Sequence, residues 1–305
     1  MSKKIILSKS KLTEIIERYL KGEPLYKLCK EVNVSNTYLR KIFKELKVEI
    51  RSQFKVSMDE NYFEKIDTPE KAYFLGLLYA DGYYDGKCIA ISLQEKDKEI
   101  LEKFKTIIKH NGKLQFIKRK KENCQNSYRL SICTKKPIKD LIEKGIVRNK
   151  TYNMLIPNFI KEELYSHFIR GFFDGDGCIT KSKCYCVSFV CQKIFLEHIG
   201  SKFIDNCNFI NRLYFTKRKK NKDDGVFTLT FNSNIQSLTI LNYLYKDSNN
   251  LFLKRKYEKY KLLINEIENK NYSSSAFKYV KEDYMKLVKD AKIIINEIEK
   301  VQKYI

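Results

Sequence analysis

Two nine-residue segments decide the fold: residues 74–82 read FLGLLYADG, and residues 169–177 read IRGFFDGDG. Each is mostly apolar, carries a glycine at its third position and ends in an Asp-Gly pair. Glycine inside a helix costs ~1 kcal/mol relative to alanine, and that cost is tolerated where two helix backbones approach closely. Gly76 and Gly171 therefore predict two helices that pack against each other along these segments.

The Asp-Gly pairs place one carboxylate at the end of each predicted helix. We expect Gly82 and Gly177 to end the helices through the conformational freedom of glycine. Side-by-side helices would bring Asp81 and Asp176 together at their C-terminal ends. Two close carboxylates repel each other unless a cation lies between them. A single Asp-Gly pair is usually a turn or a helix cap, but two copies at equivalent places indicate a shared site.

The side chains around this site restrict its chemistry. Carboxylate oxygens without cysteine or histidine partners suit Mg²⁺ or Mn²⁺. Divalent ions placed in this way can activate water and stabilise the leaving oxygen of a phosphodiester. The three histidines and nine cysteines show no zinc-site spacing. The sequence thus predicts a site for Mg²⁺ or Mn²⁺ rather than for zinc.

The chain also repeats itself beyond the two motifs. FIKRKK at 116–121 recurs as FTKRKK at 215–220, and an alternating strand pattern follows each copy. A glutamine closes an earlier strand in both halves, as Gln94 and Gln192. Each half reads in the order helix, two strands, helix, two strands, helix.

The remaining pattern gives approximate bounds for further elements. We expect strands at 88–93, 128–132 and 227–231, and helices at 96–110, 137–144, 254–268 and 279–304. The segment 51–68 is interpreted as a linker. The last helix has no functional interpretation beyond covering apolar surface.

Residues 12–49 predict three short helices, at 12–21, 25–31 and 36–46. Pro24 suits the start of the second helix, and Ser35 suits the N-cap of the third. The tight turn between them gives the spacing of a helix-turn-helix, with Cys29, Val34 and Leu39 facing inward. The third helix would then be a recognition helix, and its outward residues would be Asn36, Thr37, Tyr38, Arg40, Lys41 and Lys44. The alternative is a small helical bundle whose basic face is only solvated.

The charge balance points to a polyanionic partner. The chain holds 60 Lys and Arg against 37 Asp and Glu, a net charge of +23, which favours binding to nucleic acid. A lysine-rich proteome from an AT-rich genome would give a similar composition. The sequence shows no signal peptide or membrane span, so we expect an intracellular protein with reduced thiols.

The two motifs resemble the signature motifs of the LAGLIDADG homing endonucleases, and the resemblance covers about residues 70–265. It implies an α+β fold of two pseudo-symmetric αββαββα repeats with antiparallel DNA-binding sheets, joined here to the all-α helix-turn-helix module. It also implies that Asp81 and Asp176 bind the catalytic Mg²⁺ or Mn²⁺. The resemblance does not decide whether the backbone of Ala80 is a further metal ligand.

Further site residues follow from the same resemblance. Gln94 and Gln192 match a catalytic position that helps to order water. Lys136 matches a catalytic-pocket lysine, and Lys135 is an almost equal candidate. The second repeat has Asn234-Ile235 at the corresponding place, which implies a one-sided basic pocket.

The resemblance also gives the basic clusters a role, since each repeat of the family presents a saddle of strands to the DNA major groove. Contacts with phosphate are expected from Lys118, Arg119, Lys120, Lys217, Arg218 and Lys219. Bases would be read by polar strand residues such as Gln115, Tyr128, Tyr214 and Thr228. A solvated hairpin tip is the alternative for either cluster alone.

These observations predict four segments and a monomer that acts on double-stranded DNA. The segments are the helix-turn-helix module with its linker (1–55), the two repeats (56–158 and 159–268) and a C-terminal helical tail (269–305). Two other functions stay open: a non-cutting DNA-binding regulator that pairs this scaffold with a helix-turn-helix, and a maturase that binds host intron RNA. A protein-splicing element is disfavoured because no splicing block is recognisable.

Overall fold

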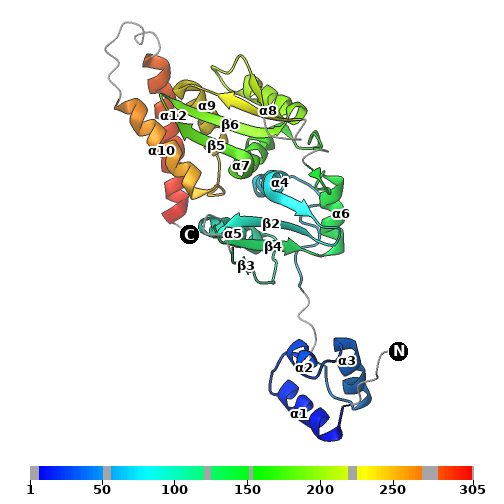
Figure 1. The fold of residues 1–305 in the computed structure, drawn as a ribbon. Helices are drawn as coiled ribbons and strands as arrows, with labels where there is room; N and C mark the ends of the chain where they lie inside the picture. The colour runs from blue at the N-terminus through cyan, green and yellow to red at the C-terminus, as the bar shows by residue number, and fades with distance from the viewer. Residues whose placement is uncertain are drawn as a thin grey trace. The chain divides into compact units, whose positions relative to one another are not determined.

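The computed structural model describes residues 7–50, 56–119, 125–150, 154–218, 225–269 and 281–303. The chain divides into two compact units, Met1–Lys55 and Val56–Ile305 (Figure 1). Each unit has a hydrophobic core of its own.

The first unit contains three helices, α1 (Lys9–Leu20), α2 (Leu25–Glu31) and α3 (Asn36–Glu45), close to the predicted positions. The Ser35 side chain accepts a hydrogen bond from the backbone N–H of Tyr38 and so caps α3. Asn33, in the turn before α3, has a positive φ of 53°, a conformation that asparagine tolerates. The core of this unit consists of Ile15, Tyr19, Leu28, Cys29, Leu39 and Phe43.

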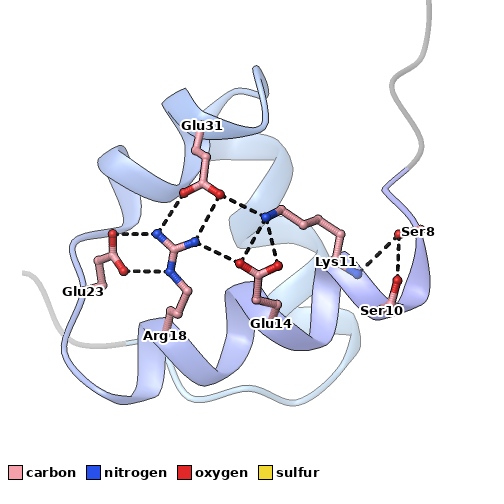
Figure 2. Close-up of polar contacts among 7 residues, drawn as sticks. All are labelled: Ser8, Ser10, Lys11, Glu14, Arg18, Glu23 and Glu31. Atoms are coloured by element: carbon pink, nitrogen blue, oxygen red, sulfur yellow. Dashed lines mark hydrogen bonds and ion pairs between the residues drawn. The ribbon is translucent and has the colours of Figure 1, made fainter.

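An ionic network joins α1 to α2 and to the turn between them (Figure 2). Arg18 donates two hydrogen bonds to Glu23, of 2.9 and 3.0 Å, and also contacts Glu14 and Glu31. Lys11 contacts Glu14 and Glu31 as well. Exposed ion pairs contribute little singly, but a network of them is more effective. The network thus pairs the acids Glu14, Glu23 and Glu31 with Lys11 and Arg18.

The second unit contains two copies of one topology. The first copy runs α4 (Pro69–Asp81), β1 (Gly82–Tyr84), β2 (Ile89–Gln94), η1 (Glu95–Asp97), α5 (Lys98–Ile107), β3 (Gln115–Ile117), β4 (Ser127–Ile132) and α6 (Lys135–Glu143). The second runs η3 (Glu162–Leu164), α7 (Tyr165–Asp176), β5 (Gly177–Lys181), β6 (Tyr185–Gln192), α8 (Lys193–Asn206), β7 (Tyr214–Lys217), β8 (Val226–Phe231) and α9 (Asn234–Tyr245). The four-stranded antiparallel sheets have the equivalent orders β1-β2-β4-β3 and β5-β6-β8-β7. The predicted α+β fold of two repeats is confirmed.

Helices α4 and α7 lie side by side between the two sheets (Figure 1). A Cβ atom added to Gly76 would lie 1.9 Å from the backbone oxygen of Phe168, and one on Gly171 would lie 1.9 Å from that of Tyr73. The backbones are therefore in direct contact where the two glycines face the opposite helix. The structure confirms the close approach that these glycines predict.

The glycines at the helix ends act differently from the prediction. Gly82 and Gly177 have extended backbones, with φ of −73° and −90°, and do not use the conformations reserved for glycine. A Cβ on Gly82 would lie 2.5 Å from the oxygen of Leu78, and one on Gly177 would lie 2.6 Å from that of Phe173. Contact with the preceding helical turn, rather than backbone freedom, is the reason for glycine here.

The interpretation of 51–68 as a linker is wrong for its second part. Met58, Tyr62, Phe63 and Ile66 are buried and belong to the core of the second unit. These apolar residues recur at intervals of three and four positions, a pattern that indicates one buried face and that the interpretation as a linker overlooks.

Two further helices follow the second repeat, α10 (Lys254–Glu268) and α12 (Lys281–Lys303). Helix α12 packs against α9 and α10 and buries Val288, Ala291, Ile294 and Ile298. It covers apolar surface, as expected. In the parts of the chain that the structure describes, no helix is long and apolar enough to cross a membrane.

One pair of cysteines departs from the expectation of reduced thiols. Cys88 and Cys133 form a disulfide. They flank the paired residues Ile89 and Ile132 at one end of the β2–β4 ladder. This covalent link therefore joins two strands that are already neighbours in the sheet.

We expect the substitution Gly76→Ala to lower the free energy of unfolding by at least ~2 kcal/mol, because the new methyl group would force the two helix backbones apart. Urea denaturation followed by circular dichroism measures this. The matched control is Gly200→Ala in α8, whose Cβ would lie nearest to the side chain of Leu213 rather than to backbone atoms. The control should stay within ~1 kcal/mol of the parent; an equal loss in both variants would contradict the role given to Gly76.

Candidate active site and nucleic-acid interface

The ends of α4 and α7 meet where the two acidic residues lie. Asp81 is the last residue of α4 and Asp176 the last of α7. A Cβ on Gly175 would lie 2.2 Å from the Cβ of Ala80 and 2.9 Å from Oδ2 of Asp81. Glycine at position 175 therefore lets the second motif approach the carboxylate of the first.

Both carboxylates are harder to ionise than usual. Burial raises the pKa of Asp81 to about 6, and the nearby charge of Asp176 adds to this effect. Asp176 has more exposed surface, yet partial burial still raises its pKa. Lys150 and Lys256 act in the opposite direction on both groups. The site therefore pairs two crowded acids with two ammonium groups.

Lys150 lies beside the acids on the side of the first repeat. Its Nζ donates a 2.6 Å hydrogen bond to the backbone oxygen of Ala80. Burial lowers the pKa of Lys150, while the charges of Asp176 and Asp81 oppose that shift. The residue follows α6 in a segment without periodicity, and no pattern in the sequence identified it.

Lys256 lies on the side of the second repeat, in the first turn of α10. Its Nζ donates to the backbone oxygens of Phe173, Asp174 (2.9 Å) and Gly177 (2.6 Å). These oxygens lie where α7 ends and β5 begins, so a cation there matches the negative end of the helix. Burial lowers the pKa of Lys256 to about 8. Sequence reasoning missed it, although it occupies a position on the buried stripe of α10 with Tyr260.

The sequence-based choice of Lys136 is not supported by its surroundings. Its Nζ contacts Glu64 at 2.6 Å and Asp140 at 3.5 Å, and the Glu64 carboxylate raises the pKa of Lys136. Its neighbour Lys135 is the exposed first residue of α6. The motif position at the start of α6 thus points to a surface ion pair, whereas the ammonium groups near the acids come from later segments.

The expectation of a one-sided basic pocket is corrected as well. Asn234 occupies the place in the second repeat that corresponds to Lys136, and its Oδ1 accepts a 2.7 Å hydrogen bond from the backbone N–H of Tyr185. The second side has its lysine in α10, outside the repeated topology. The two lysines therefore come from positions that are not equivalent in the two repeats.

The two glutamines occupy equivalent places in the two sheets. Gln94 is the last residue of β2, three residues beyond Ile91, which pairs with Gly82. Gln192 is the last residue of β6, three residues beyond Phe189, which pairs with Gly177. Both strands thus run past the acid of their own repeat before the glutamine is reached.

A difference between the motifs has a structural explanation. Asp174 is fully buried and its Oδ2 accepts hydrogen bonds from Tyr73 (2.8 Å) and from the backbone of Leu253 (2.9 Å). Tyr79, its counterpart in the first motif, instead donates to the backbone oxygen of Lys144 at 2.6 Å. Asp174 thus fixes the segment that leads into α10, which carries Lys256.

The basic clusters lie at the ends of the edge strands β3 and β7. Lys118, Arg119, Lys217 and Arg218 are exposed, and the charge of Arg218 reaches Asp176. Lys120 and Lys219 lie outside the described residues. The described part of each cluster thus presents positive charge at the margin of its sheet.

The alternation of side chains along each strand shows which of the expected base-reading residues lie on the outer face of a sheet. Gln115, Tyr214 and Thr228 lie on the sheet faces that point away from the core. Tyr128 shares the core face with Leu130 and packs against the core. The expectation for Tyr128 is therefore wrong, because a shift of one residue along a strand reverses the face.

The donor set fits a hard divalent cation. Among the described residues, no group of three or more His, Cys, Asp or Glu side chains could hold a metal. The candidate donors at this position are the two carboxylates of Asp81 and Asp176. Two crowded carboxylates are stabilised by a cation between them. Mg²⁺ is commonly bound by one or two carboxylates together with water and substrate phosphate.

Comparison with known proteins identifies the first repeat. The family model described as LAGLIDADG-like domain matches residues 68–144, which run from the N-cap of α4 to the end of α6. A stretch of 146 residues, 45% of this chain, is 29% identical to the glutamine–fructose-6-phosphate aminotransferase (isomerizing) of Methanocaldococcus jannaschii. The chain spans 13% of the length of that relative.

Similar solved structures include three with distant sequences. The meganuclease I-SmaMI bound to uncleavable DNA has 15% identity and a TM-score of 0.44, over 73% of this chain and 98% of that one. The homing endonuclease I-LtrWI bound to target DNA has 12% identity and a TM-score of 0.41, over 81% and 98%. The N-terminal LAGLIDADG domain of DUF199/WhiA has 15% identity and a TM-score of 0.41, over 61% and 89%.

The matched domain is thus the first of two repeats with one topology, each built on a Gly-containing helix that ends in Asp-Gly. Over its first repeat, the chain is therefore similar to the LAGLIDADG-like domain.

Proposed function

We propose that this protein is a site-specific endonuclease that hydrolyses phosphodiester bonds of double-stranded DNA, as a homing endonuclease does. The observation that carries the proposal is the meeting of Asp81 and Asp176 at the ends of two packed helices, with Lys150 and Lys256 beside them. Other residues of the buried helix pair serve packing, so an acid pair with raised pKa values points to function.

The aspartates, lysines and glutamines of the site would have different roles in the reaction. Asp81 and Asp176 would hold Mg²⁺ or Mn²⁺, which supplies an activated water and stabilises charge on the leaving oxygen. Lys150 and Lys256 place positive charge beside the acids, where the scissile phosphate would lie. Gln94 and Gln192, at equivalent strand ends, are suited to orient water through their amide groups. Both acids lie on one chain, so we expect the monomer to cut both strands.

The exposed basic residues at the strand ends support affinity for the duplex. Lys118, Arg119, Lys217 and Arg218 would contact phosphate on both sides of the cleavage position. Such contacts fix the protein on the helix axis but carry no sequence information. Specificity must then come from the outer faces of the sheets.

The first unit supports an additional contact with DNA. Its α3 presents Asn36, Thr37, Tyr38, Arg40 and Lys41 as the recognition helix of a helix-turn-helix would. The ionic network of Arg18 and Lys11 balances the acids of α1 and α2. We propose that this unit binds DNA through α3 and extends the target beyond the cleavage site.

The helix-turn-helix also favours a second candidate, a DNA-binding regulator that does not cut. The retained acid pair favours the nuclease, because a pure binding protein gains nothing from two crowded carboxylates that are hard to ionise. A maturase that binds intron RNA is a third role, compatible with the same basic surface.

The decisive test is cleavage of duplex DNA from the genomic region that flanks the gene. We expect double-strand cleavage that requires Mg²⁺ or Mn²⁺ and that falls at least ~1,000-fold in an Asp81→Asn, Asp176→Asn double variant, because the variant cannot hold the cation. Asp205→Asn with Asp290→Asn, at two exposed acids, is the matched control and should cut normally. Tight binding without cleavage in any divalent ion would favour the regulator.

The acid pair should also limit stability. Its raised pKa means that Asp81 is less easily charged in the folded chain than in the unfolded chain, so ionisation opposes folding as the pH rises from about 4 to about 6. In EDTA at pH 7, Asp81→Asn should raise the free energy of unfolding by ~1–2 kcal/mol, below the ~3 kcal/mol implied by the full shift, because solvent screens a half-buried group. Near pH 4 the gain should vanish. A loss of stability at pH 7 would contradict this account.

The proposed role of the first unit can be tested separately. Replacing Arg40, Lys41 and Lys44 by alanine should lower the affinity for target DNA at least ~10-fold and reduce the salt dependence of binding. The control removes the same charge from α1 and α2 (Lys9, Lys27 and Lys30 to alanine) and should have a smaller effect. Footprinting should show a shorter protected region for the α3 variant alone; equal footprints would exclude the proposed contact.

A further inference from the structure

The outer faces of the two sheets differ at one central position. In the first sheet, the strands bury Ile89, Ile91 and Leu93 on β2 and Leu130 and Ile132 on β4. Because side chains alternate along a strand, Arg129 on β4 faces away from this core. It is the only lysine or arginine within the strands of that sheet.

Arg129 is held in place by neutral groups rather than by an ion pair with a carboxylate. Its neighbours across the ladder are Ser92 on β2 and Gln115 on β3. Its Nε donates a 3.4 Å hydrogen bond to Oγ of Ser92, and its guanidinium lies 5.4 Å from the centre of the Tyr83 ring. Within the described residues, no carboxylate lies at ion-pair distance from it. The two terminal nitrogens therefore remain available to a ligand on the outer face.

The equivalent position in the second sheet has different chemistry. The repeat places Thr228 on β8 where Arg129 lies on β4, and the neighbours of Thr228 are Val190 and Thr216. These side chains offer hydroxyl and methyl groups and no charge. The lysines of this sheet, Lys181 and Lys217, are the last residues of their strands.

This contrast has a direct meaning if the sheets lie in the major groove. An arginine on such a face forms paired hydrogen bonds with O6 and N7 of guanine, whereas apolar groups, including the methyl group of threonine, contact the methyl group of thymine. We propose that Arg129 reads a guanine in the half-site bound by the first repeat, and that Thr228 and its neighbours read thymine at the pseudo-symmetric position. This inference rests on the DNA-binding part of the proposed function and makes the target asymmetric at that position.

The test is selection of bound sequences from a randomised duplex DNA library in EDTA, so that cleavage plays no part. The parent protein should enrich guanine at one position of the first half-site. In Arg129→Ala, the affinity for the selected guanine site should fall about ten- to one-hundredfold relative to sites with another base there. Preferences at the remaining positions should stay as they are in the parent.

Two further variants make the result specific. Arg119→Ala removes the same charge from the strand margin and should weaken binding to all sequences alike, with no change in base preference. Arg129→Lys keeps the charge and should retain part of the guanine preference, which also guards against a folding defect in the alanine variant.

The outcomes separate the inference from the proposed function. If Arg129→Ala weakens binding equally for every sequence, as Arg119→Ala does, Arg129 binds phosphate and the inference is overturned while the nuclease stands. If the parent enriches no sequence and cuts no duplex, both proposals fail together.

Discussion

The direct contact between the backbones of α4 and α7 is the constraint on which the second unit depends. At Gly76 and Gly171 there is no room for a single methyl group. This contact sets the spacing of the two helix ends and hence the spacing of Asp81 and Asp176. The sheets attach directly after these acids, at Gly82 and Gly177, so the positions of both outer faces follow from the same contact.

Much of this could be predicted from the sequence because duplicated features reinforce each other. One Asp-Gly pair is ambiguous, but two pairs in Gly-containing apolar helices, each opening the same order of elements, define the α+β fold and the meeting of the acids. Strand faces were harder to assign, since they depend on register to within one residue. The sequence pattern therefore suggests Tyr128 for the outer face, whereas its neighbour Arg129 is the residue that lies there.

The lysines beside the acids could not be predicted in the same way, because they come from parts of the chain that the repeat does not duplicate. Lys150 follows α6, and Lys256 lies in α10. Their relation to the acids depends on tertiary contacts between segments about 70 to 80 residues apart in sequence. The burial of Met58 and Phe63 and the disulfide between Cys88 and Cys133 are likewise consequences of packing. Local patterns report on such contacts only when they repeat.

The buried bonds of α10 have a consequence for the order in which the protein is made. Asp174 accepts a hydrogen bond from the backbone N–H of Leu253, and the carbonyl groups at the end of α7 accept hydrogen bonds from the ammonium group of Lys256. A ribosome releases the N-terminal parts of a chain first, so α7 emerges well before the groups that complete its C-terminal end. Until α10 follows, a buried carboxylate and several backbone oxygens lack their partners, which is unfavourable in a dry core. The nascent chain therefore acquires its finished acid pair only late in synthesis, after both sheets have already been translated.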